Sequence, residues 1–263
     1  MSALQTVFTD IADAIREKTG KADKITPANM ASEIEGISVG GGDGDSVADA
    51  IIDGSVTAIN SDAESVQTYA FYRRKKLVSA NVNKAETIGN SVFYECTALT
   101  SVNIDSARYI ETKAFYGCSA LTSIYAPYAT KVTDSAFSQC KGLLSAVIYG
   151  STGLFSSAFY YCENLKKIEM IFASNIKSYA FGECKALVSV VLRGYSNTCS
   201  LENINAFINT PVANGTGYIY VPSALIDTYK TATNWSTFAS QFRALEDYTA
   251  DGTITGELDE TKI

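Results

Sequence analysis

The strongest constraint in this sequence is a pattern that repeats every 22 residues. A phenylalanine recurs at this interval, a leucine follows each phenylalanine by six positions, and a cysteine follows five of them by three positions. The phenylalanines are Phe71, Phe93, Phe115, Phe137, Phe159 and Phe181; the leucines are Leu77, Leu99, Leu121, Leu143, Leu165 and Leu187; the cysteines are Cys96, Cys118, Cys140, Cys162 and Cys184. A fixed period of this size is typical of a solenoid of stacked units.

An alternating segment follows each leucine and predicts one strand per coil. In the second coil, Val102 and Ile104 are expected to face the core, and Ser101, Asn103 and Asp105 to face outward. No single coil could bury its phenylalanine, leucine and aliphatic residues alone. The pattern therefore predicts a parallel β ladder over one continuous core.

The rest of the chain divides into segments around this solenoid. Residues 1–36 predict a hairpin of two short amphipathic helices, an attachment segment, and residues 37–45 a glycine-rich linker. The solenoid with its N-terminal cap is expected at 46–217, and a strand with two helices, near 223–230 and 236–245, at 218–246. Trp235, Phe238, Phe242 and Leu245 are expected to close the core there, before an acidic tail at 247–263.

Composition excludes several classes of function. The chain has no histidine, which removes the commonest general base and most catalytic zinc sites, and we expect no enzymatic activity and no cofactor. A net charge of −7 argues against nucleic-acid binding. No stretch of 18 apolar residues predicts membrane insertion. The cysteines lack the clustered spacing of a metal site, so they are interpreted as thiols packed in the core.

Two surfaces are candidates for binding. The first is a patch of apolar, aromatic and charged residues at outward positions of coils three to six: Tyr125, Val147, Tyr149, Ile171, Val191 and Arg193. Exposed residues of this kind mark interaction surfaces, although self-contact or no role remains open. The second is a column of tyrosines directly after the repeat phenylalanines: Tyr72, Tyr94, Tyr116 and Tyr160. These rings could form a recognition stripe or a half-buried edge that covers the adjacent coil.

The repeat unit Ile-x-x-x-Ala-Phe-x-x-Cys-x-x-Leu-x-x-Val/Ile-x-Ile, carried by residues 66–193, resembles the BspA-like (Treponema-type) leucine-rich repeat family. The segment from Ala114 to Ile124 is a close match. The resemblance implies a right-handed leucine-rich repeat solenoid, with a strand on one side of each coil and short strands or turns on the other. Members are often surface proteins that bind host proteins or other cells.

The two ends carry a second resemblance. Residues 10–37 and 220–236 are similar to segments of tail- or baseplate-associated proteins of phages and prophages. This resemblance implies a virion protein, made in the bacterial cytoplasm, that docks to a tail or baseplate protein through residues 1–36. The solenoid would then bind a host-surface protein or glycan. The alternative is a BspA-like adhesin on the bacterial cell surface.

Overall fold

The computed structural model describes residues 56–148, 153–194 and 198–247. The predicted helical hairpin at 1–36, the linker at 37–45 and the tail from residue 248 onward lie outside these ranges, as does Tyr149 of the predicted patch. Within the described residues, no helix is long and apolar enough to cross a membrane.

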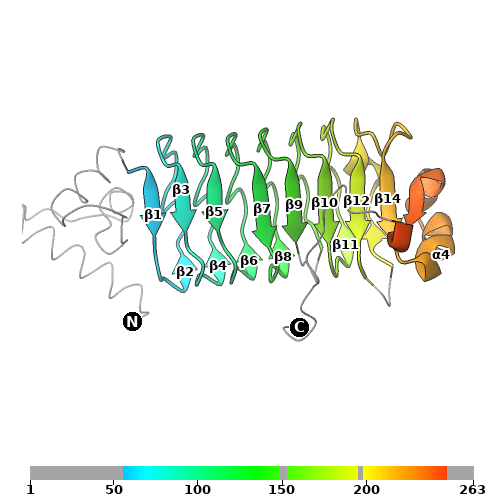
Figure 1. The fold of residues 1–263 in the computed structure, drawn as a ribbon, viewed down its shortest axis with the longest axis horizontal. Helices are drawn as coiled ribbons and strands as arrows, with labels where there is room; N and C mark the ends of the chain where they lie inside the picture. The colour runs from blue at the N-terminus through cyan, green and yellow to red at the C-terminus, as the bar shows by residue number, and fades with distance from the viewer. Residues whose placement is uncertain (1–55, 149–152, 195–197, 248–263) are drawn as a thin grey trace, which may run out of the picture.

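The predicted solenoid fold is confirmed, and its main feature is a long row of parallel strands (Figure 1). The row begins with a sheet in the order β1-β3-β5 and continues in a sheet that runs from β7 through β9, β10, β12 and β14 to β15. The strands are β1 (Ala58–Asn60), β3 (Ser79–Asn81), β5 (Ser101–Asn103), β7 (Ser123–Ala126), β9 (Ser145–Ile148), β10 (Lys167–Met170), β12 (Ser189–Leu192), β14 (Tyr218–Val221) and β15 (Phe242–Ala244). We call this row the main ladder.

A second ladder of shorter strands lies along another side of the coils (Figure 1). Its strands are β2 (Ser65–Val66), β4 (Thr87–Ile88), β6 (Tyr109–Ile110), β8 (Lys131–Val132), β11 (Asn175–Ile176) and β13 (Ser200–Leu201). Leu154 continues it by single bridges to Val132 and Ile176. In the regular coils, both ladders pair residues 22 positions apart, as with Val66 and Ile88, so the sequence period sets the register there. At the C-terminal end the spacing changes, and β12 pairs with β14 through Ser189 and Tyr218.

The repeat phenylalanines form a stack of rings through the core. Phe137 is 0% exposed, and its ring centroid lies 5.1 Å from that of Phe115 and 5.0 Å from that of Phe159. The stack ends at Phe207, 5.4 Å from Phe181, so one column of aromatic contacts links the coils. Stacking continues this far because identical side chains fall at identical positions in successive coils.

The turn that carries each phenylalanine has a backbone feature that the sequence did not predict. In the coil of Phe93, the residues two before and two after it, Ser91 and Glu95, have left-handed φ angles of 52° and 51°. The N–H of Phe93 donates to the carbonyl of Ala114, and that of Glu95 to the carbonyl of Tyr116, both at 2.7 Å. Non-glycine residues pay for the left-handed conformation, and the inter-coil hydrogen bonds offset that cost.

The C-terminal end of the stack is closed by short helical turns and one strand. The elements are η1 (Ile204–Phe207), η2 (Ser223–Leu225), α4 (Ile226–Thr231), η3 (Trp235–Gln241), β15 and η4 (Leu245–Asp247). Trp235, Phe238 and Phe242 are buried as predicted, whereas Leu245 is partly exposed. The prediction of one helix over 236–245 is wrong, because the chain extends at Phe242 and pairs with β14. A helix there would leave the last strand edge unpaired.

The long interval between Phe181 and Phe207 ties the last coils to this cap. The backbone N–H of Cys199 donates to the hydroxyl of Tyr229 at 2.7 Å, and the indole N–H of Trp235 donates to the carbonyl of Cys199 at 2.6 Å. All three residues are buried. The inserted segment therefore provides, at Cys199, the hydrogen-bond partners of the buried Tyr229 hydroxyl and the buried Trp235 indole N–H.

Candidate functional site

One outward-facing position of the main ladder changes character along the stack. In the first three strands it is held by Asn60, Asn81 and Asn103 in register. From β7 to β15 the matching positions, also in register, are Tyr125, Val147, Glu169, Val191, Tyr220 and Arg243. We call these positions the outer row. They lie outside the hydrophobic core cluster, so core packing does not require the change from asparagine to larger apolar residues.

The predicted patch is only partly exposed. Tyr125 is 56% exposed and Val147 is half-buried, whereas Ile171 and Val191 are 2% and 0% exposed. The prediction that these last two residues form an exposed surface is therefore wrong. Strand alternation correctly placed them outside the core cluster. It does not show how far the neighbouring side chains extend over them.

Val191 and Ile171 are short side chains among long neighbours. Val191 lies in register between Glu169 and Tyr220, and Ile171 directly follows strand β10 beside Arg193 of the next coil. Arg193 turns back toward Glu169, and its side chain is only 18% exposed. Because their neighbours are longer, these small aliphatic side chains lie beneath the surface and are not accessible for contact.

The pair of Glu169 and Arg193 was missed as a unit from the sequence. The Nε of Arg193 donates to Oε1 of Glu169, whose side chain is 4% exposed, and Oε2 has no hydrogen-bond partner. Burial raises the pKa of the Glu169 carboxyl, and the hydrogen bond and charge of Arg193 oppose that rise. The sequence signal that could have revealed this pair is the opposite charge of Glu169 and Arg193 at a separation of one repeat plus two positions. Within the pair, the charge of Arg193 compensates that of Glu169.

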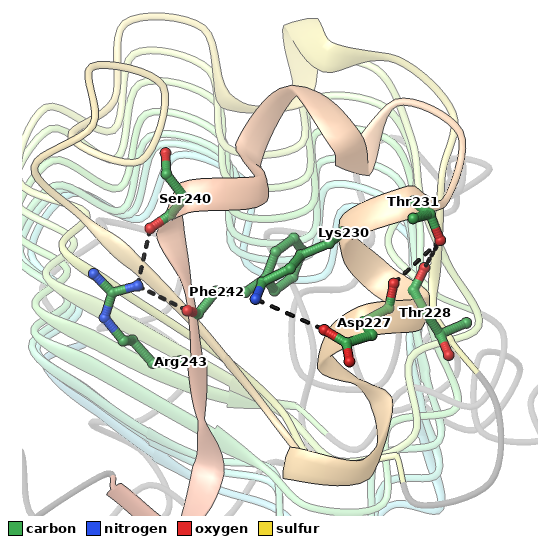
Figure 2. Close-up of polar contacts among 7 residues, drawn as sticks. All are labelled: Asp227, Thr228, Lys230, Thr231, Ser240, Phe242 and Arg243. Atoms are coloured by element: carbon green, nitrogen blue, oxygen red, sulfur yellow. Dashed lines mark hydrogen bonds and ion pairs between the residues drawn. The ribbon is translucent and has the colours of Figure 1, made fainter.

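The far end of the outer row carries residues that the sequence analysis did not select. The side chain of Arg243 lies over the ring of Tyr218, with Cζ 4.3 Å from its centroid, and Tyr218 contacts Tyr220 edge-on at 6.4 Å. Nη1 of Arg243 also donates to the carbonyls of Ser240 and Phe242, at 2.9 and 2.7 Å (Figure 2). These bonds hold the Arg243 side chain against the backbone of the residues that directly precede it.

The tyrosine column is divided into two parts. Tyr72, Tyr94 and Tyr116 stack face to face at 4.9 Å spacing. Ser138 then interrupts the column, and Tyr160 instead contacts Tyr161 and Tyr179 edge-on, at 4.5 and 5.9 Å. Tyr94 has a neighbouring ring on each face, and Tyr94 and Tyr116 are half-buried, as a half-buried edge predicts, whereas Tyr72 is 38% exposed. The second part is not stacked in this way.

The cysteine column lies in the core. Each thiol donates to the carbonyl of the phenylalanine in the preceding coil, at Sγ–O distances of 3.0–3.1 Å. Burial raises the pKa of Cys96 to about 12 and holds those of Cys118 and Cys162 well above the ordinary value. Neutral buried thiols are poor nucleophiles and poor metal ligands. The described residues contain no cluster of three or more His, Cys, Asp and Glu side chains suited to a metal ion.

Comparisons with known proteins agree with the solenoid geometry. The family model described as a BspA type leucine-rich repeat region matches six copies over residues 54–166 and 152–216. A search of curated proteins found no match.

The search of solved structures found similar leucine-rich repeat proteins, the first of which shares this fold. A T. pallidum leucine-rich repeat protein is 20% identical, with a TM-score of 0.51 over 68% of this chain and 90% of that one. A Bacteroides ovatus leucine-rich repeat protein is also 20% identical, with a TM-score of 0.49 over 73% of this chain and 55% of that one. The pneumococcal vaccine antigen PcpA is 17% identical, with a TM-score of 0.46 over 72% of this chain and 40% of that one.

Proposed function

Because this chain belongs to the BspA-type leucine-rich repeat family, we propose that it is a non-enzymatic recognition protein whose outer row binds another protein. The observation that carries the proposal is the change along this row from asparagine to larger side chains, of which Tyr125, Val147, Val191 and Tyr220 are aromatic or aliphatic. A solenoid needs no apolar residues at positions outside its core. Their presence from β7 onward supports a contact surface on this half of the main ladder.

The contact surface is centred on Tyr125. This side chain is the most exposed of the large hydrophobic residues that the structure describes, at 56%, and half-buried Val147 lies beside it in register. Tyrosine supplies a large contact area at a small entropic cost, and aromatic residues dominate binding energies at protein interfaces. Ile171 and Val191 support this surface from below, and the charge of Arg193 compensates that of Glu169. Tyr149 remains a proposed member.

The partner class can be tested with the full chain. The immobilised protein is used to capture solubilised bacterial and host surface proteins, and each captured protein is purified for measurement of its dissociation constant. Tyr125→Ala should weaken binding at least tenfold, about 1.4 kcal/mol. Tyr109→Ala is the matched control, because Tyr109 is 46% exposed but lies on β6 of the second ladder.

Two outcomes of this experiment would contradict the proposal. One is equal affinity of the wild type and Tyr125→Ala for the captured protein. The other is saturable binding on a glycan array with no protein captured, which would assign a glycan as the ligand of the solenoid.

We further propose that residues 1–36 attach the chain to a phage or prophage tail or baseplate protein. This proposal rests on the resemblance to tail-associated proteins that we inferred from the sequence of residues 10–37 and 220–236. The second candidate is a bacterial cell-surface adhesin, which the family membership supports. Mass spectrometry of purified phage particles and of proteins shaved from intact producing cells separates the two. Recovery in particles alone supports the virion role, and recovery from the cell surface alone supports the adhesin.

A further inference from the structure

The second part of the tyrosine column forms an aromatic cluster on the turn edge of the last coils. Tyr160 contacts Tyr161 and Tyr179 edge-on, and Tyr179 is 40% exposed. Gly182 lets Tyr160 lie flat, because a Cβ at that position would be 2.9 Å from the Cδ2 and Cε2 atoms of the ring and 3.1 Å from Cγ2 of Ile208. Ile208 is 37% exposed, so the cluster continues into an accessible aliphatic side chain.

An acidic side chain lies next to these rings. The N–H of Tyr161 donates to the carbonyl of Gly182 at 3.0 Å, so the residue after Gly182, Glu183, lies beside Tyr161 in the next coil. Burial raises the pKa of Tyr160, with smaller contributions in the same direction from Tyr161 and from the negative charge of Glu183. Oε1 of Glu183 accepts a hydrogen bond from Nδ2 of Asn209 at 2.6 Å, and Oε2 lies 4.0 Å from Nζ of Lys185. Glu183 is thus held in place, while its lysine neighbour is at the limit of an ion pair.

The first coils hold a cation at the equivalent turn, where the stacked rings of Tyr72 and Tyr94 stand in the positions of Tyr160 and Gly182. The Cζ of Arg73 lies 5.3 Å from the ring centroid of Tyr72 and 5.9 Å from that of Tyr94, and its Nε is 2.9 Å from Oε2 of Glu95. The guanidinium therefore has rings on one side and a carboxylate on the other. Glu95 and Glu183 are equivalent, since each follows its repeat phenylalanine by two positions.

At the C-terminal cluster the described residues place no cation over the rings, and Lys185 instead approaches Glu183 at 4.0 Å. The position equivalent to Arg73 is Tyr161, and among the described residues no lysine or arginine lies over the rings of Tyr160, Tyr161 or Tyr179. Aromatic faces beside a carboxylate attract a guanidinium by both cation–π and ionic interactions. The net charge of −7 also favours a cationic ligand.

We propose that the cluster of Tyr160, Tyr161, Tyr179 and Glu183 binds an arginine side chain of a partner protein. Ile208 would contact the aliphatic stem of that arginine. The surface lies on the turn edge of the coils, whereas Tyr125 lies on the main ladder. This inference is therefore independent of the outer row, and each surface can fail its test without affecting the other.

The test uses the full chain with its tyrosine rings labelled with ¹³C. The probe is N-acetyl-argininamide, and its neutral isostere N-acetyl-citrullinamide is the matched control ligand. The arginine probe should give saturable shifts of the Tyr160, Tyr161 and Tyr179 signals, with about fivefold weaker binding of the citrulline probe. Glu183→Gln should weaken the arginine probe about fivefold. Tyr179→Leu serves the same purpose if Glu183→Gln does not fold.

A second variant provides an internal positive control. Arg73→Ala removes the resident guanidinium and should allow the probe to shift the signals of Tyr72 and Tyr94, which do not respond in the wild type. The proposal is overturned if the C-terminal tyrosine signals show no saturable shift, if the citrulline probe binds as well as the arginine probe, or if the folded variant binds like the wild type.

Discussion

Replacing Phe137 with alanine tests whether the phenylalanine stack holds the coils together. Phe137 is fully buried and has stacked rings on both sides, at 5.1 and 5.0 Å. Removing a buried phenylalanine costs about 3–5 kcal/mol from lost transfer energy and the cavity. Each ring pair adds about 0.5–1.5 kcal/mol. With two pairs lost, we expect the free energy of unfolding to fall by about 5 kcal/mol.

The end of the stack provides the comparison. Phe71 is 7% exposed and has one described ring partner, Phe93, at 5.4 Å, so Phe71→Ala should cost about 3 kcal/mol. Urea denaturation of the full chain compares the two variants. Unfolding is monitored by both circular dichroism and tyrosine fluorescence, because a difference between the two signals would reveal separate unfolding of coils. Phe137→Leu should recover part of the loss. An equal or larger cost for Phe71→Ala would refute the reasoning.

Two further predictions concern buried polar groups. Because the pKa of Cys96 is raised to about 12 in the fold and is about 8.5 in the unfolded chain, only the unfolded chain ionises between these values. Stability should therefore fall as pH rises from about 8.5, measured as the urea midpoint at pH 8 and pH 10.5, and Cys96→Ser should show a smaller fall. Tyr229→Phe removes the acceptor of the Cys199 N–H and should cost about 1–3 kcal/mol in thermal or urea unfolding; a change below 0.5 kcal/mol would show that water replaces the hydroxyl.

At the candidate surfaces, the sequence predicted which face each side chain lies on but not how exposed it is. Strand alternation correctly identified the outer row, including Tyr125 and Val147, because a period of two assigns each side chain to a face. It could not show that Ile171 and Val191 are hidden. Exposure on an outer face depends on the length and conformation of neighbouring side chains, and here Arg193 turns toward Glu169.

The orientation of the rings in the tyrosine column also could not be predicted from the sequence. Tyr72, Tyr94, Tyr116 and Tyr160 occupy identical positions in the repeat. Only the structure shows that the first three stack on one another, whereas Tyr160 turns against Gly182 and contacts its neighbours edge-on. Ring orientation is decided by the residue in the next coil, which is 22 positions away in the chain.

By itself, the sequence determined the stacking of coils, the register of the main ladder in the regular coils and the buried columns of phenylalanine, cysteine and leucine. These follow from a period of 22 residues, because identical units can bury their apolar faces only against one another. Only the tertiary structure decided the left-handed turns beside each phenylalanine, the strand β15 in place of a helix, and the accessible side chains of the outer row. These features depend on hydrogen bonds and contacts between coils, which no local pattern contains.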